Sequence, residues 1–150
     1  MPEIDRGRPI DLARFVDAQS ADCDHALQEL RSGTKRSHWM WYVFPQFQGL
    51  GSSDSSRRYA IRSRAEAAAY LAHPVLGPRL RECAEALLAH HARSARQILG
   101  TPDDLKLHSS ATLFAEVEGA GVFTKLLQRF FDGEVDQKTL EFLRASEQSA

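Results

Sequence analysis

The chain has 150 residues, with 19 lysines and arginines against 20 aspartates and glutamates, and a formal net charge of −1. This length suits one domain with its own core, and the 43% hydrophobic and 26% charged residues are ordinary for a globular protein. The near-neutral charge argues against binding of duplex nucleic acid or an anionic membrane surface. No apolar run approaches the roughly 20 residues of a membrane span.

The N-terminus and the two cysteines indicate the cellular compartment. Residues 1–9 carry mixed charges and lack the apolar stretch of a signal peptide, so we expect a flexible N-terminal arm. Cys23 and Cys83 each fall on the apolar stripe of a predicted helix, which favours buried free thiols over a disulfide or a metal pair. The sequence therefore predicts a cytoplasmic protein with a single helical domain over residues 10–145 and a frayed tail over residues 146–150.

The first part of the chain shows apolar residues at helical spacing. A first helix follows Ile10, and Ser20 is placed to cap a second helix that ends at Gly33. The segment 35–46 has strand-favouring residues, but Ser37 can cap a short helix that Pro45 stops, so a helical turn or short helix is favoured there.

Later helices are marked by start and stop signals. A glycine- and serine-rich loop holds a short helix from about Asp54 to Tyr59. Ser63 and Ser94 each open a stretch with capping-box spacing. Pro102 begins a further helix, a stripe from Val122 to Phe131 forms another, and Asp136 caps the last. Together these elements predict an all-α fold: one compact, irregular domain of about seven helices.

The segment from Lys35 to Gln46 is the most concentrated candidate for a functional site. Core packing accounts for the rings between Trp39 and Phe44, above all for Phe44 and its neighbour Val43, because aromatic side chains dominate core energetics. It accounts less well for the polar residues beside them, which are Lys35, Arg36, Ser37, His38 and Gln46. Rings that stack, cations that meet charge, and a hydroxyl and an amide that fix orientation are what a pocket for a planar anionic ligand needs.

A second polar cluster covers residues 103–110. Asp104 and His108 are spaced i, i+4 on a predicted helix, close enough to hydrogen-bond. This cluster is either an ordinary helix N-terminus or a polar wall that faces the first cluster across a pocket. On the second interpretation the predicted ligand-binding residues are Lys35, Ser37, Trp39, Trp41, Gln46, Lys106 and Ser109. His38 and Asp104 are the candidate acid–base catalysts, although the sequence leaves open whether the chain is an enzyme.

Motifs for phosphate loops, dinucleotide sites and zinc proteases are missing from the sequence. His90 and His91 are adjacent, about 100° apart on a helix, and do not make a natural ligand pair. We therefore predict no metal and no cofactor.

The chain resembles the bacterial domain-of-unknown-function family 1810 over about residues 12 to 143. The resemblance is carried by six stretches of the sequence. They are Lys35-x-Ser37-His38-Trp39-Met40-Trp41-x-Val43-Phe44-Pro45-Gln46, Gly49-Leu50-Gly51-x-Ser53, Tyr59-x-Ile61, Glu66-Ala67-x-x-Tyr70-Leu71, His73-Pro74-x-Leu76, and Asp103-Asp104-x-Lys106-Leu107-x-Ser109-Ser110-x-Thr112-Leu113-Phe114. It implies a compact all-α fold and supplies no established activity. Such proteins are sometimes labelled calpastatin, but inhibitors of that kind are disordered, whereas this composition buries a core.

Two classes of function follow from these clusters. The first is a pocket for a small planar or anionic, nucleotide-like ligand. The alternative is a non-catalytic protein-interaction module that uses the aromatic segment 38–46 as its contact patch. The arginines near Tyr59 are the only feature that favours nucleic-acid binding, and the near-neutral total charge of the chain argues against it. A homo-oligomer is left open.

Overall fold

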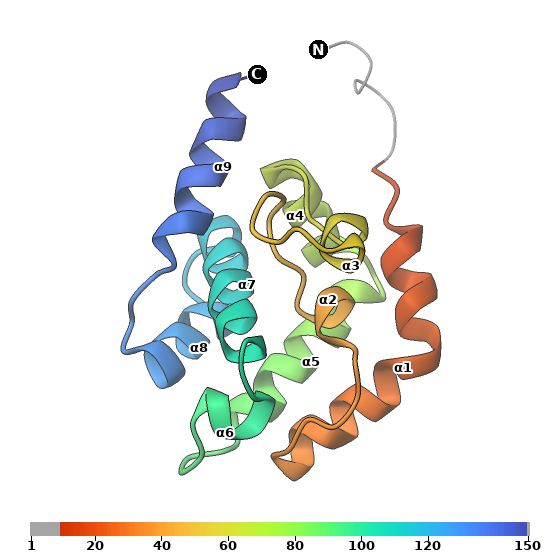
Figure 1. The fold of residues 1–150 in the computed structure, drawn as a ribbon, viewed down its shortest axis with the longest axis vertical. Coiled ribbons are helices and arrows are strands. Elements are labelled where there is room, and N and C mark those ends of the chain that lie inside the picture. The colour runs from red at the N-terminus through yellow and green to blue at the C-terminus, as the bar shows by residue number, and fades with distance from the viewer. Residues whose placement is uncertain (1–9, 150) are drawn as a thin grey trace.

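The computed structural model describes residues 10–149, and within them the chain forms nine helices and no strand (Figure 1). The helices are α1 (Ala13–Ser32), α2 (Met40–Val43), α3 (Asp54–Arg58), α4 (Arg64–Ala72), α5 (Leu76–Leu88), α6 (Ala95–Leu99), α7 (Asp103–Glu118), α8 (Val122–Phe131) and α9 (Gln137–Ser149). The all-α prediction is confirmed, but its count of about seven helices is too low for the described residues. The predicted arm over residues 1–9 lies outside them.

Three of the nine helices in residues 10–149 are short, and the sequence predicts a helix start or a short helix near each of them. α2 has four residues, and α3 and α6 have five each, so each is little more than one turn and shows no clear periodicity. At the other end of the chain, α9 extends to Ser149, beyond the predicted end of the domain at Ala145. None of the helices in residues 10–149 is long and apolar enough to cross a membrane.

The region predicted as two helices around Ser20 is the single helix α1. The Ser20 hydroxyl donates to the carbonyl of Asp17 at 2.8 Å. Its hydrogen bond therefore lies within α1, and Ser20 does not cap the start of a helix. Gly33 ends α1 as predicted. Its φ of 85° is left-handed, and its N–H donates to the carbonyls of Glu29 and Leu30.

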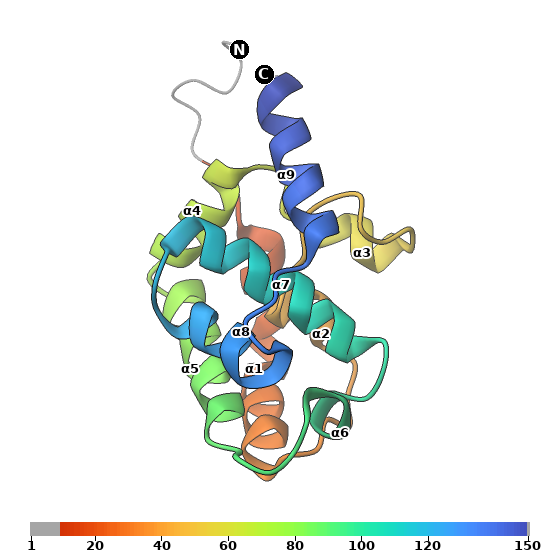
Figure 2. The ribbon, with the colours of Figure 1, turned by 90° about the vertical axis from the view of Figure 1, so that its left-hand side faces the viewer.

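α5 packs against α1, α4 and α8, α7 packs against α4, α6, α8 and α9, and the core lies among these helices (Figures 1 and 2). A chain of aromatic contacts runs through it. Phe15 of α1 meets Tyr70 of α4 edge-on at 5.1 Å, Tyr70 meets Phe114 of α7 at 5.5 Å, and Phe114 meets Phe123 of α8 at 5.4 Å. All four rings are fully buried, so the apolar faces of helices distant in sequence share one core.

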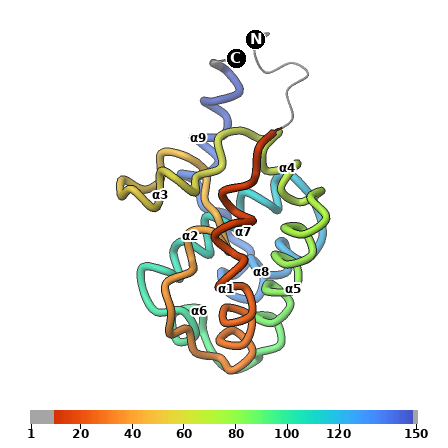
Figure 3. The backbone as a smooth tube through the Cα atoms, turned by 90° about the vertical axis from the view of Figure 1, so that its right-hand side faces the viewer, coloured from red at the N-terminus to blue at the C-terminus, as the bar shows by residue number. Residues whose placement is uncertain are grey.

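α3 and the loop before it project from the helical body, and Figures 2 and 3 show this from opposite sides. We call residues 47–61 the α3 projection. Its base is closed by an isolated parallel bridge between Phe47 and Ile61. The N–H of Gln48 donates to the Ile61 carbonyl at 2.9 Å, and the Ile61 N–H donates to the Gln46 carbonyl at 2.8 Å. The two ends of the projection are therefore fixed against each other.

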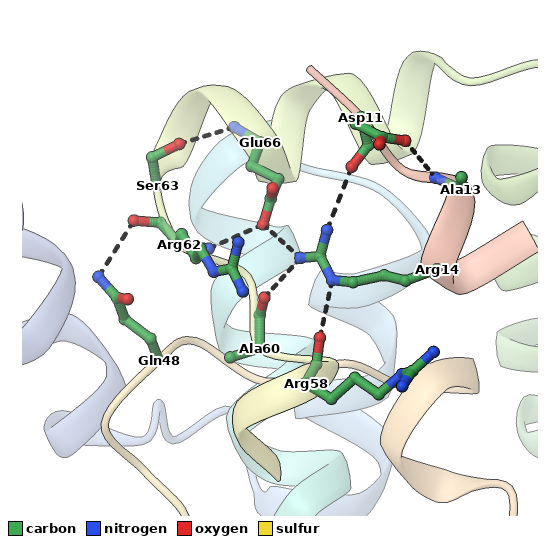
Figure 4. A network of polar contacts seen from close by, with 9 residues as sticks. All are labelled: Asp11, Ala13, Arg14, Gln48, Arg58, Ala60, Arg62, Ser63 and Glu66. Carbon is green, nitrogen blue, oxygen red and sulfur yellow. Dashed lines mark hydrogen bonds and ion pairs between the residues drawn. The ribbon is translucent and has the colours of Figure 1, made fainter. Parts of the chain in front are cut away.

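Arg14 of α1 holds the base of the α3 projection from the other side (Figure 4). Its guanidinium donates to the carbonyls of Arg58 and Ala60, each at 2.8 Å, and to Glu66 Oε1 at 3.0 Å. The same Glu66 oxygen accepts the N–H of Arg62 at 2.9 Å. Because a guanidinium offers five donors in a rigid fork, one side chain fixes the end of α3 and the start of α4 together.

Candidate functional site

An open cleft of about 530 Å³ lies between the α3 projection, the first part of α7 and the start of α9. Predicted ligand-binding residues that line this cleft are Trp41, Gln46, Lys106 and Ser109. Three serines of the α3 projection, Ser52, Ser53 and Ser56, line it too, together with His108, Asp136 and Lys138. The cleft therefore combines an indole ring, two ammonium groups, several hydroxyls, an amide and a carboxylate.

Lys106 and Trp41 form one wall of the cleft. The Lys106 ammonium lies 3.4 Å from the centroid of the Trp41 ring, well within the range of a cation–π contact. It also lies 3.1 Å from Asp103 Oδ1, and only 17% of the Lys106 side chain is exposed. The ring and the cation are thus held in position by contacts that do not depend on a ligand.

Lys35 lies behind this wall. Its ammonium forms an ion pair with Asp103 Oδ2 at 2.8 Å and lies 5.2 Å from the centroid of the Trp39 ring. Burial opposes ionisation of Asp103, but hydrogen bonds from Lys35 and Lys106 outweigh it and lower the pKa of the carboxyl. The two predicted clusters, residues 35–46 and 103–110, are therefore in direct contact through Asp103. Lys35 itself is nearly buried, so it supports the cleft wall from behind and does not face the cleft.

Ser37 and Trp39, both predicted to bind a ligand, are engaged by Glu29 instead. Trp39 is fully buried, and its indole N–H donates to Glu29 Oε1 at 2.8 Å. The Ser37 hydroxyl donates to Glu29 Oε2 at 2.6 Å, and the N–H groups of Arg36 and Ser37 donate to Oε1. Of the two indoles that are candidates for stacking on a ligand, Trp39 is therefore enclosed in the core and Trp41 lines the cleft.

Glu29 is not among the residues that the sequence predicts for this region. Partial burial opposes its ionisation, but the hydrogen bonds from Ser37, Arg36 and Trp39 prevail and lower the pKa of Glu29 to about 2. One feature of the sequence could have indicated this role of Glu29. Glu29 lies in the last turn of α1, where the helix dipole disfavours a carboxylate, so a carboxylate there calls for donors from another segment.

His38 and Asp104, the predicted acid–base pair, do not meet at the cleft. As far as the described residues go, the lining includes neither of them. His38 is exposed, and Asp104 Oδ1 accepts the N–H of Leu105 at 2.9 Å. The expected contact between Asp104 and His108 is replaced by contacts of His108 with other residues. The His108 ring stacks on Phe131 at 4.2 Å, and its Nε2 lies 2.8 Å from the Glu134 carbonyl oxygen.

Asp136 joins α7 to the start of α9 at the cleft. Its Oδ2 accepts hydrogen bonds from the hydroxyls of Ser109 at 2.9 Å and Thr139 at 2.5 Å. Its N–H donates to Thr112 Oγ1 at 2.9 Å. The sequence predicted Asp136 only as a helix cap, because nothing in a linear pattern brings it beside Ser109. The structure adds this carboxylate to the cleft and fixes the orientation of Ser109.

Comparison with known proteins gives a family and a structural relative. The family model described as "Protein of unknown function (DUF1810)" matches residues 9–143. The chain is similar to the conserved hypothetical protein Rv1873 from Mycobacterium tuberculosis, known from its crystal structure, with 49% sequence identity and a TM-score of 0.89. The match covers 91% of this chain and 99% of that one. No curated protein matches the chain.

Proposed function

The chain belongs to the family DUF1810, whose function is unknown, and from its cleft we propose that it binds a small planar or anionic, nucleotide-like ligand. The observation that carries the proposal is the Lys106 ammonium held against the Trp41 ring at the edge of the cleft. Because the ammonium covers one face of the indole, a planar group would contact the rest of the ring, and the ammonium would supply charge for an anionic group.

The rest of the lining supports a polar ligand with several hydrogen-bonding groups. Gln46 and the serines of the α3 projection offer donors and acceptors, and Lys138 adds a second cation. A cleft of about 530 Å³ lies within the roughly 300–1,000 Å³ that small-molecule sites occupy. We propose a binding function and assign no acid–base step to His38 or Asp104.

The burial of the aromatic segment favours this ligand over the contact patch that is the alternative. Within residues 38–46, the buried residues are Trp39, Met40, Tyr42, Val43, Phe44 and Pro45. A partner protein would therefore reach little of the segment beyond Trp41, His38 and Gln46. Interface hot spots need rings that the partner can cover, and most of these rings are already covered by the core.

The proposal is tested by thermal unfolding of the whole chain against nucleotides, nucleosides and sugar phosphates. A ligand at about 100 times its Kd stabilises a protein by about 2.7 kcal/mol. For a domain of this size that raises the Tm by about 5–10 °C. We expect such a shift for at least one nucleotide, and a much smaller shift in Lys106→Met, which keeps the aliphatic stem and removes the charge.

Lys125→Met is the matched control, because Lys125 is an exposed lysine on α8 outside the cleft lining. It should respond to the ligand as the unaltered protein does. A panel that leaves the Tm unchanged, or a shift that Lys106→Met and Lys125→Met reduce equally, would contradict the proposal.

A further inference from the structure

A second hollow of about 260 Å³ adjoins the cleft on the α3 projection. We call it the arginine hollow, because Arg57 and Arg62 line it beside Gln48. Gly51 and Ser56 line both the cleft and the arginine hollow. The two spaces are therefore neighbours that share these two small residues as part of their lining.

Gly51 packs closely against Ser56 between the cleft and the arginine hollow. A Cβ added at Gly51 would lie 2.6 Å from the Cβ of Ser56, closer than real Cβ atoms approach. Any side chain at residue 51 would push the two segments apart and alter the floor that the cleft and the arginine hollow share. Glycine at residue 51 therefore lets this segment pack directly against Ser56 at the boundary between the cleft and the arginine hollow.

The guanidinium groups of the arginine hollow have little compensating charge. Arg57 lies 3.7 Å from Asp54 Oδ1, but both side chains are largely exposed, and exposed pairs of this kind contribute little. Within the described residues, no carboxylate lies within 4.0 Å of the Arg62 guanidinium. The hollow thus presents two cations that are available to an anion.

The backbone that carries Arg62 is fixed in advance. Its N–H donates to Glu66 Oε1 at 2.9 Å, and its carbonyl accepts from Gln48 Nε2 at 3.3 Å (Figure 4). Arg14 holds the neighbouring Ala60 carbonyl at 2.8 Å. A site whose backbone is already ordered loses less conformational entropy when a ligand binds.

We propose that the arginine hollow is a phosphate subsite continuous with the cleft, so that the ligand is a nucleoside diphosphate or triphosphate. Its planar base lies at the Trp41 and Lys106 wall, and its phosphate chain crosses Gly51 and Ser56 to Arg57 and Arg62. Guanidinium groups suit this role because their paired N–H donors match phosphate oxygens. This inference rests on the proposed function of the cleft and adds the class of ligand.

The test is calorimetric titration with the mono-, di- and triphosphates of adenosine, guanosine and uridine. For at least one base, we expect the triphosphate to bind at least tenfold more tightly than the monophosphate. In the double variant Arg57→Gln, Arg62→Gln that advantage should disappear, while the Kd of the monophosphate stays within twofold. Circular dichroism verifies that the double variant is folded, and both side chains are exposed, so we expect native helix content.

The matched control is the double variant Arg96→Gln, Arg144→Gln, which removes the same charge from exposed arginines on α6 and α9. It should keep the advantage of the triphosphate. Equal affinity for mono- and triphosphates in the unaltered protein would overturn the subsite and leave the proposed function standing. Failure of every nucleotide to bind would overturn both. A single-stranded oligonucleotide that binds more tightly than any triphosphate would also overturn the inference, since the arginines would then serve a nucleic acid.

Discussion

The ammonium of Lys106 lies 3.4 Å from the centre of the Trp41 ring. The cation is held there by an ion pair with Asp103 Oδ1, and the other carboxylate oxygen of Asp103 forms an ion pair with Lys35. Since cation and ring are both partly shielded from water, their attraction should exceed that of a fully exposed pair.

This contact should be measurable by a double-mutant cycle. We expect Lys106→Met and Trp41→Leu each to lower the free energy of unfolding. Their effects should couple by about 0.5–2 kcal/mol, the range of a partly desolvated cation–π contact. Urea unfolding of the two single variants and the double variant gives the coupling. Additive effects would show that the contact contributes nothing.

The two tryptophans should differ sharply in their access to solvent. Trp39 is fully buried, whereas Trp41 lines the cleft. In Trp39→Phe the remaining fluorescence comes from Trp41, and acrylamide should quench it readily. In Trp41→Phe the remaining Trp39 should be quenched much less. Similar Stern–Volmer constants for the two variants would contradict the placement of these rings.

Glu29 should make stability depend on pH in the acid range. Its pKa falls from an ordinary value of 4.5 to about 2 on folding, so the folded state favours the ionised form. The contribution of Glu29 is therefore complete above about pH 4.5 and is lost as the pH falls towards 2. We expect Glu29→Gln to be less stable than the unaltered protein at pH 7, and the difference to shrink steadily between pH 4.5 and 2. A difference in unfolding free energy that stays constant over that range would exclude this linkage.

Arg14 should contribute more stability than other arginines in ion pairs. Its side chain is 16% exposed and that of its partner Glu66 is 10% exposed. Removing one partner of a fully buried pair costs roughly 3–5 kcal/mol, so for this partly exposed pair we expect Arg14→Met to cost about 2–3 kcal/mol. Arg31→Met is the matched control, because the ion pair of Arg31 with Glu82 is 62% and 55% exposed and should contribute under about 1 kcal/mol. Chemical denaturation compares the two, and equal losses would refute the special role of Arg14.

Local signals predicted most of the fold. Ser94 and Gln97 form both halves of the predicted capping box at the start of α6. Ser63 likewise accepts the N–H of Glu66 at the start of α4, but the Glu66 carboxylate bonds Arg62 and Arg14 instead of closing the box. A capping pattern predicts where a helix begins. It does not predict a long-range partner that competes for the same carboxylate.

The site was harder to predict because aromatic residues close together in the sequence differ in burial. Trp39 precedes α2 and is buried, whereas Trp41 lies within α2 and lines the cleft. A helix of four residues has no periodicity from which its inward face can be read. The serines of the α3 projection and Asp136 were missed as site residues for a related reason. Their place in the cleft depends on how three separate segments pack together.

Asp103 has a consequence for the dynamics of the chain. Its two oxygens divide between Lys106 at the cleft and Lys35 in the interior, so a ligand that draws Lys106 towards the cleft leaves Asp103 more strongly paired with Lys35. The N–H of Lys35 donates to the Ile98 carbonyl at 2.7 Å, and neither residue lines the cleft. Slower hydrogen exchange at this single amide would then signal occupancy of the cleft, through a local opening equilibrium and without contact between the ligand and residue 35.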